Sequence, residues 1–79
     1  MTHVVTLLGK PGCHPCDEAR EAVARITAEL GVPWSERDVT ADPADFAEYG
    51  ERIPVILIDG QEHCYWVVEE ERFRTALRA

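Results

Sequence analysis

The sequence has few basic side chains and no long hydrophobic run. Its 79 residues include 8 Lys and Arg against 15 Asp and Glu, which gives a formal net charge of −7. This charge argues against nucleic acids and anionic membranes as partners, because both are polyanions. No segment approaches the roughly 18 apolar residues that cross a bilayer, and the first residues lack the basic stretch and apolar core of a signal peptide. We therefore expect a cytoplasmic protein that binds neither nucleic acid nor membrane.

Cysteine is also scarce, with three residues in the whole chain. Small secreted domains are stapled by several disulfides, and three cysteines cannot supply such a framework. Cys13 and Cys16 are so close in sequence that a bridge between them constrains the unfolded chain by only about 2 kcal/mol. The spacing of the pair therefore indicates a chemically reactive site rather than a stabilising cross-link. For Cys64, the odd cysteine, a core position is expected because free cysteine is usually buried; the alternative is a regulatory or intermolecular thiol.

The length allows a single domain, residues 1–79. Apolar periodicity and turn residues predict seven elements. They are strands at 3–8, 34–39, 55–58 and 64–68, and helices at 15–30, 43–49 and 69–77. The turn Asp59-Gly60 is short enough to make the last two strands antiparallel. The order β-α-β-α-β-β-α predicts an α/β fold, with a four-stranded mixed sheet and helices on both faces.

Two helices have recognisable ends. In the first, an apolar face recurs at steps of three and four residues and includes Cys16, while Gly31 is a natural residue to end the helix. In the second, Asp42 and Pro43 form the start, and Phe46 and Tyr49 are expected to make its apolar contacts.

The segment between the first strand and the first helix carries the chemistry. It reads Lys10-Pro11-Gly12-Cys13-His14-Pro15-Cys16. Cys13 immediately precedes the helix, where backbone N–H groups favour a thiolate, and Pro15 fits the first helical turn. Cys16 lies one turn further, on the apolar face. We expect an exposed, acidic nucleophile at Cys13 and a buried resolving thiol at Cys16, the asymmetry that two-step thiol–disulfide exchange needs.

Charged neighbours act on Cys13 in both directions. His14 and Lys10 add positive character near its sulfur, whereas Asp17 and Glu18 oppose them from the first helical turn. The sequence therefore does not show whether these charges together favour or disfavour the thiolate form of Cys13.

These features resemble the thioredoxin-fold superfamily and, within it, the small glutaredoxin-like proteins. The resemblance spans essentially the whole chain and rests on the Cys-x-x-Cys after the first strand, the order of elements, and Ile53-Pro54 before the third strand. It implies that the Ile53-Pro54 peptide bond is cis, that Pro54 lies beside the cysteine pair, and that the main chain of Ile53 pairs with substrate. Lys10 matches a lysine with which glutaredoxins hold the carboxylate of glutathione.

The chain departs from the glutaredoxin pattern at two places and from the thioredoxin pattern at one. His14-Pro15 replaces Pro-Tyr between the cysteines, with the proline placed as in thioredoxin. Gly12 stands where thioredoxin has a tryptophan. The Gly-Gly pair that follows the hairpin in glutaredoxins is absent, and residues 67–70 read Val-Val-Glu-Glu. The electron donor therefore stays open between glutathione, another small thiol and a thioredoxin-type reductase.

The sequence thus predicts a monomeric thiol–disulfide oxidoreductase that reduces protein or small-thiol mixed disulfides without a separate cofactor. Lys10 and Arg52 are candidates to bind a carboxylate-bearing thiol, with ordinary solubilising side chains as the alternative. The competing function is a thioredoxin-like module that binds a metal, an iron–sulfur cluster or a protein through the same face. We expect no metal site, because His63 and Cys64 should point to opposite faces of their strand.

Overall fold

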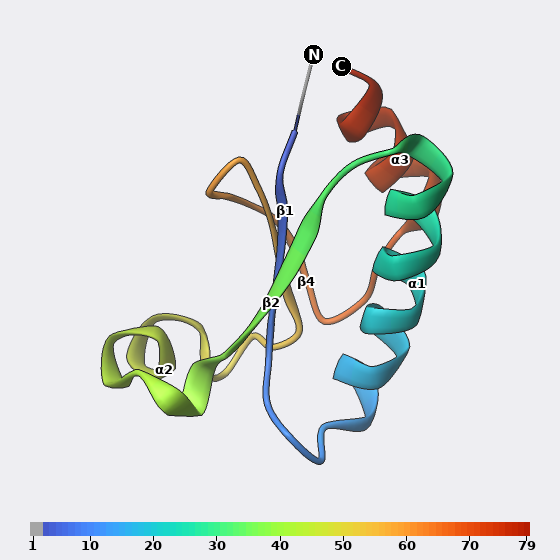
Figure 1. Ribbon diagram of the computed structural model, residues 1–79. Coiled ribbons are helices and arrows are strands. Elements are labelled where there is room, and N and C mark those ends of the chain that lie inside the picture. Colours follow the sequence, from blue (N-terminus) through green and yellow to red (C-terminus); the bar gives the residue numbers. More distant parts are fainter. Residues whose placement is uncertain (1–2) are drawn as a thin grey trace.

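The computed structural model describes residues 3–79 and contains a four-stranded sheet flanked by helices (Figure 1). The elements are β1 (Val5–Gly9), α1 (His14–Leu30), β2 (Trp34–Asp38), the 3-10 helix η1 (Val39–Ala41), α2 (Pro43–Tyr49), β3 (Val55–Ile58), β4 (Gln61–Tyr65) and α3 (Glu70–Arg78). The strand order is β2-β1-β3-β4. β1 runs parallel to β2 and antiparallel to β3, and β4 is antiparallel to β3. The predicted α/β fold class and order of elements are confirmed.

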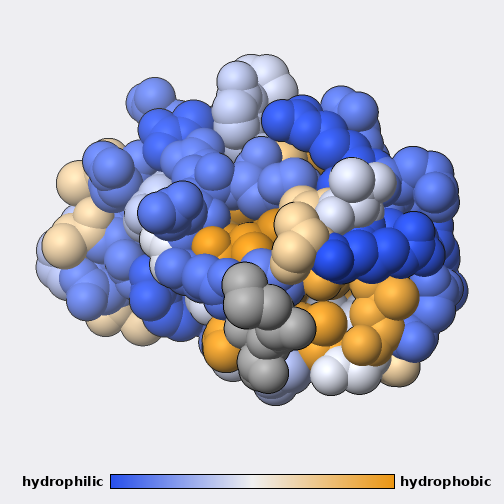
Figure 2. All heavy atoms as spheres, turned by 90° about the horizontal axis from the view of Figure 1, so that it is seen from above, coloured by the Kyte–Doolittle hydropathy of each residue, from blue (hydrophilic) through white to orange (hydrophobic). Residues whose placement is uncertain are grey.

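The helices lie on the two faces of the sheet. α1 and α3 cover one face, whereas α2 lies on the other side, near one end of the sheet (Figure 1). The loop from β1 to α1 is at this same end, opposite the C-terminus. At the end with the C-terminus, hydrophobic side chains are exposed at the surface and are surrounded by hydrophilic ones (Figure 2). No helix within residues 3–79 is long and apolar enough to cross a membrane.

Alternating side chains of β1 and β3 supply both halves of the core. The larger core cluster lies under α1 and α3 and contains Val5, Leu7, Ala19, Val23, Ile26, Ile56, Phe73 and Leu77. The smaller core cluster lies toward η1 and α2 and contains Leu8, Val39, Val55 and Leu57. Since successive strand residues point to opposite faces, the continuous apolar run of β3 fills both clusters. This double burial holds β1 firmly at the base of the cysteine loop.

The ends of α1 are as the sequence predicted. Gly31 has a positive φ of 68°, the left-handed conformation that ends many helices, and its N–H bonds to the carbonyl of Thr27. Cys13 caps the other end of the helix, and proline occupies its first turn. The backbone itself thus defines where Cys13 and Cys16 lie relative to the helix axis.

Three expectations about the second half of the chain are wrong. β4 begins at Gln61 rather than Cys64, because Asp59 and Gly60 both have positive φ and form a tight turn that lets pairing start at once. It ends at Tyr65, and Trp66 leaves the sheet with a φ of 69°. Phe46 is exposed rather than packed, so Tyr49 makes the apolar contact of α2 with the smaller core cluster.

The third error concerns His63 and Cys64. The register shifts within β3–β4, between Ile56 and Leu57, so that His63 is an extra residue in β4. The His63 ring lies 5.9 Å from that of Phe73 in α3. Cys64 packs against the larger core cluster, to which Phe73 belongs. Both side chains therefore lie on the α3 side of the sheet rather than on opposite faces.

Candidate active site

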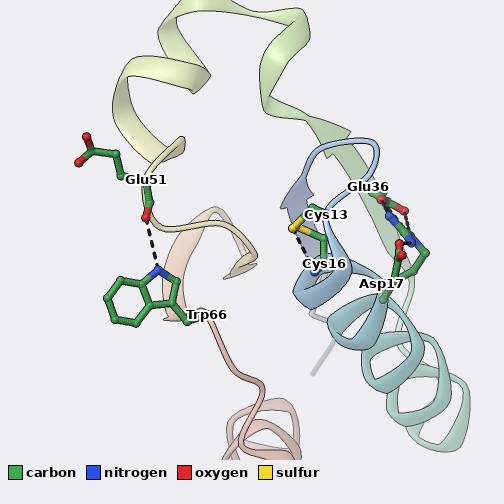
Figure 3. The surroundings of a disulfide bond; sticks show 7 residues. Cys13, Cys16, Asp17, Glu36, Glu51 and Trp66 are labelled. Carbon is green, nitrogen blue, oxygen red and sulfur yellow. Dashed lines mark hydrogen bonds and ion pairs between the residues drawn. A yellow bond between two sulfur atoms is a disulfide. The ribbon is translucent and has the colours of Figure 1, made fainter.

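The cysteine pair joins the exposed loop after β1 to the buried face of α1. Cys13 is partly exposed, whereas Cys16 is completely buried. The two residues form a disulfide, with their Cα atoms 5.2 Å apart (Figure 3). The backbone N–H of Cys16 also donates to Sγ of Cys13, at 3.3 Å. The N-cap position thus gives Cys13 both access to solvent and a hydrogen-bond donor.

Gly9 and Pro54 lie close to the pair from the sheet side. A Cβ on Gly9 would lie 3.1 Å from Sγ of Cys16, so the absence of a side chain there allows the sulfur to pack against β1. Leu8 pairs with Val55 in the antiparallel ladder, and this register places Pro54 opposite Gly9. Pro54 is buried, and the predicted cis peptide bond between Ile53 and Pro54 is confirmed. Continued by one residue, the register places Pro54 next to Gly9, the residue that packs against Sγ of Cys16.

An ion-pair network occupies the other side of α1. Asp17 accepts a hydrogen bond from Arg20 at 2.6 Å, and Arg20 also pairs with Glu36 of β2 at 2.6 Å. The hydrogen bond to Glu36, followed by that to Asp17, raises the pKa of the Arg20 guanidinium. Because the Asp17 carboxylate is paired, it opposes a thiolate at Cys13 less than an isolated charge would. His14 and Pro15 are exposed on the first turn of α1.

The structure separates the two candidate substrate-binding cations. Lys10 is exposed and borders a hollow of about 280 Å³ toward β2, together with Arg20, Glu36 and Asp38. Arg52 lies in the turn before β3. It pairs with Glu62 of β4 at 3.0 Å, and its guanidinium is 5.7 Å from the centre of the Tyr49 ring. The hydrogen bond to Glu62 raises the pKa of Arg52. The lining of the hollow beside Lys10 does not include Arg52.

The third cysteine lies away from this loop. Cys64 packs against the larger core cluster but remains partly exposed. Burial raises the pKa of its thiol to about 11, against the weaker opposing effect of Arg72. Burial, followed by Arg72, lowers the pKa of the neighbouring His63. Within residues 3–79, no three His, Cys, Asp or Glu side chains converge to hold a metal ion.

Trp66 is a site residue whose position the sequence does not predict. Its backbone N–H donates to the carbonyl of Pro54 at 2.8 Å, and its indole N–H donates to the carbonyl of Glu51 at 3.3 Å (Figure 3). These bonds attach the loop after β4 to the segment that ends at Pro54. Gly9 is the second such residue, and its place at the end of a strand before a cysteine loop is the one available signal.

Comparison with known proteins places this geometry in a family. The sequence model of the glutaredoxin-like domain (DUF836) matches residues 4–78. The uncharacterized protein Rv0508 of Mycobacterium tuberculosis is 43% identical over 75 residues, which cover 89% of this chain and 77% of that protein.

Solved structures show the same fold. The X. campestris protein XcR50 has a TM-score of 0.77 and 32% identity, over 94% of this chain and 95% of that one. Glutaredoxin 1 of Francisella tularensis, at 18% identity, has a TM-score of 0.61 over 99% of this chain and 100% of that one. With a cysteine pair at the N-terminus of α1 and a cis-proline beside it, the chain belongs to the glutaredoxin-like domain (DUF836) family and has a thioredoxin-like fold.

Proposed function

We propose that the protein is a thiol–disulfide oxidoreductase. The observation that carries the proposal is the asymmetry of the cysteine pair. Cys13 is partly exposed at the N-cap of α1, whereas its disulfide partner Cys16 is completely buried. One sulfur can meet a substrate and the other can react only with its neighbour, which is the arrangement that a two-step exchange requires.

The exchange starts from the reduced pair. The Cys13 thiolate attacks one sulfur of a substrate disulfide, so that a mixed disulfide forms and the other substrate sulfur leaves as a thiolate. Cys16, after losing its proton, attacks Sγ of Cys13. The Cys13–Cys16 disulfide then forms, the second substrate thiolate leaves, and two electrons have passed to the substrate. The cysteines themselves hold the electrons, so the cycle needs no separate cofactor.

The surroundings of the pair supply the supporting groups. Pro15 fixes the start of α1 without a missing hydrogen bond, and His14 lies next to Cys13 in the same turn. The register of β1 with β3 supports a place for Pro54 next to Gly9, and within residues 3–79 no main-chain hydrogen bond engages Ile53. We propose that the main chain of Ile53 pairs with the extended backbone of a substrate.

Electrons return to the pair from a thiol donor. We propose that glutathione or another small thiol, or a thioredoxin-type reductase, reduces the Cys13–Cys16 disulfide. Lys10 is exposed near the loop, where it can meet the carboxylate of a small thiol, and Arg52 offers a second, already paired cation. We also propose that the protein is a monomer and that it acts in the cytoplasm, where thiol donors keep such cysteine pairs reduced.

A coupled NADPH assay tests the function and the donor together. One reaction contains glutathione and glutathione reductase, and the other contains thioredoxin reductase, each with a small neutral disulfide as substrate. We expect NADPH consumption with at least one of them and none with Cys13→Ala. Cys16→Ser should accumulate a mixed disulfide through Cys13 that mass spectrometry detects. Full activity of Cys13→Ala would contradict the mechanism.

A further inference from the structure

A groove leads away from the cysteine pair along α1. It has a volume of about 320 Å³ and starts at Pro15, one of the two residues between the cysteines on the first turn of α1. One wall is α1 and the other is the loop after β4. The groove residues are Pro15, Glu18, Ala19, Glu21, Ala22, Trp66, Val67, Val68 and Glu70. We call this feature the α1–Trp66 groove.

The loop wall of the groove exposes an unusual amount of apolar surface. Tyr65, Trp66 and Val67 are consecutive, and their exposed fractions are 46%, 59% and 69%. Trp66 and Val67 line the groove together with Ala19 and Ala22. Contiguous exposed apolar surface that borders a hollow is typical of a binding site. The small alanine side chains leave room between the walls for an apolar group.

Trp66 is held in place before any ligand arrives. Its main chain bonds to Pro54 and its indole N–H bonds to the Glu51 carbonyl. Its ring also meets the Tyr65 ring edge-on, with 5.0 Å between the centres. Its φ of 69° is rare for a bulky residue and is maintained by these contacts. A side chain that is ordered in advance costs little further entropy on binding.

The charged residues of the groove are acidic. Glu18, Glu21 and Glu70 line it, and no basic residue does. Arg25 pairs with Glu21 at 3.2 Å and with Glu70 at 2.8 Å, and Arg74 also pairs with Glu70 at 3.9 Å, which leaves Glu18 as the groove carboxylate without an ion-pair partner within residues 3–79. Neither Lys10 nor Arg52 lines the groove. The charge therefore favours a cationic ligand over an anionic one.

We propose that the α1–Trp66 groove binds the polypeptide part of a protein disulfide substrate, a segment that combines an apolar side chain with a Lys or Arg. This inference rests on the proposed function and adds its substrate class. The apolar side chain lies between Trp66 and the two alanines, and the basic side chain meets Glu18. The disulfide of the substrate then reaches Cys13 at the Pro15 end. The exchange is the one written above: the substrate disulfide gains two electrons, and the external thiol donor replaces them.

Three disulfide substrates allow this inference to be tested separately from the proposed function. Two are peptides that share one disulfide and one leucine and differ in a pair of flanking residues, which are lysines in one and glutamates in the other. The third is the small neutral bis(2-hydroxyethyl) disulfide. At low ionic strength, we expect kcat/KM to be about 3–10-fold higher for the lysine peptide than for the glutamate peptide, and salt should reduce the ratio.

Variants assign the preference to the groove. Glu18→Gln should reduce the ratio of the two peptides, because it removes a carboxylate that is not paired with Arg25. Trp66→Ala should reduce kcat/KM for both peptides by about tenfold more than for the neutral disulfide, since a buried aromatic anchor dominates such contacts. Trp66→Phe keeps an aromatic wall and should restore most of this loss. Circular dichroism checks that each variant is folded.

Matched controls lie on α2, away from the groove. Phe46→Ala removes an aromatic ring that is 55% exposed, and Glu48→Gln removes an exposed carboxylate. Both should leave all three substrates unaffected. Equal kcat/KM for the two peptides, with normal reduction of the neutral disulfide, would overturn the groove assignment alone. If none of the three disulfides were reduced with any donor, the proposed function would be overturned as well.

Discussion

The backbone N–H of Cys16 points at Sγ of Cys13, with 3.3 Å between nitrogen and sulfur. This contact makes Cys13 the N-cap of α1, a position at which the partial positive charge of the helix end acts on the side chain. Cys16 is three residues further and completely buried, where desolvation disfavours a thiolate. The same turn of helix therefore gives its two sulfurs opposite electrostatic environments.

The first prediction concerns the reduced pair. We expect the pKa of Cys13 to lie below that of Cys16, because the helix end favours the anion at Cys13 and burial disfavours it at Cys16. Alkylation by iodoacetamide at pH 7, followed by peptide mass spectrometry, should modify Cys13 about ten times faster or more. Faster modification of Cys16 would contradict the assignment of nucleophile and resolving thiol.

Cys64 is an internal control for this measurement. Burial raises the pKa of its thiol to about 11, so it should stay largely unmodified at pH 7 and become reactive as the pH approaches that value. A rapid reaction of Cys64 at neutral pH would show that β4 opens in solution and would require a separate correction for unfolding.

The second prediction concerns Gly9. In Gly9→Ala the new Cβ would lie 3.1 Å from Sγ and 3.2 Å from Cβ of Cys16. The Cys16 side chain is completely buried, so it has little room to move away. We expect a loss of about 1–3 kcal/mol in the free energy of unfolding, as for other overpacked cores. Urea denaturation at constant pH measures the loss.

A double-mutant cycle attributes that loss to Cys16. Cys16→Ala removes the sulfur but keeps Cβ, so Gly9→Ala should cost less in this background than in the wild-type chain. An equal cost in both backgrounds would mean that the strain arises elsewhere, and a stabilising effect of Gly9→Ala would contradict the packing argument.

The sequence predicts the first half of the fold well for local reasons. Apolar steps of three and four residues define α1, Gly31 ends it, and the cysteine pair falls at its start. These signals depend on residues that are neighbours in the chain, so tertiary packing does not override them. The cis bond at Ile53-Pro54 is different, since it followed from the family resemblance and not from the local pattern.

The second half was harder to predict because its signals are not local. β4 is an edge strand that begins with Gln61 and Glu62, and these polar residues conceal it until the turn brings them beside β3. The extra residue in β4 then moves His63 to the side of Phe73. The position of Trp66 depends on the carbonyls of Pro54 and Glu51, both distant in sequence. Such contacts form only when the whole sheet is assembled.

The third prediction concerns the two cations near the cysteine loop. The double variant with Lys10→Ala and Arg52→Ala should raise the KM for an anionic disulfide such as oxidised glutathione by about 2–5-fold, because exposed charge pairs contribute up to about 1 kcal/mol. Lys10→Ala should account for most of this, since the Arg52 guanidinium is already paired with Glu62. Arg78→Ala, on the exposed end of α3, controls for net charge. An unchanged KM in the double variant would refute the idea.

The fourth prediction concerns a pH-dependent contact between β1 and the β3–β4 turn. Nδ1 of His3 lies 2.5 Å from a carboxylate oxygen of Asp59, and the other carboxylate oxygen accepts the backbone N–H of Val4. The hydrogen bond with Asp59, followed by that with the Ala79 carbonyl, raises the pKa of His3 above its ordinary value of 6.5. The same hydrogen bond, followed by that from Val4, lowers the pKa of Asp59 below its ordinary value of 3.8.

These two shifts define the pH range in which the pair stabilises the fold. The contribution of His3 is complete below pH 6.5 and is lost as the pH rises through its higher folded-state pKa. The contribution of Asp59 is complete above pH 3.8 and is lost as the pH falls through its lower folded-state pKa. Asp59→Asn keeps an acceptor for Val4 and tolerates the positive φ of 54°. Urea denaturation should therefore show the largest difference in unfolding free energy from wild type at about pH 4–6.5 and a smaller one at pH 9, with His3→Gln giving the same profile. A difference that stayed constant up to pH 9 would show that the ion pair does not form in solution.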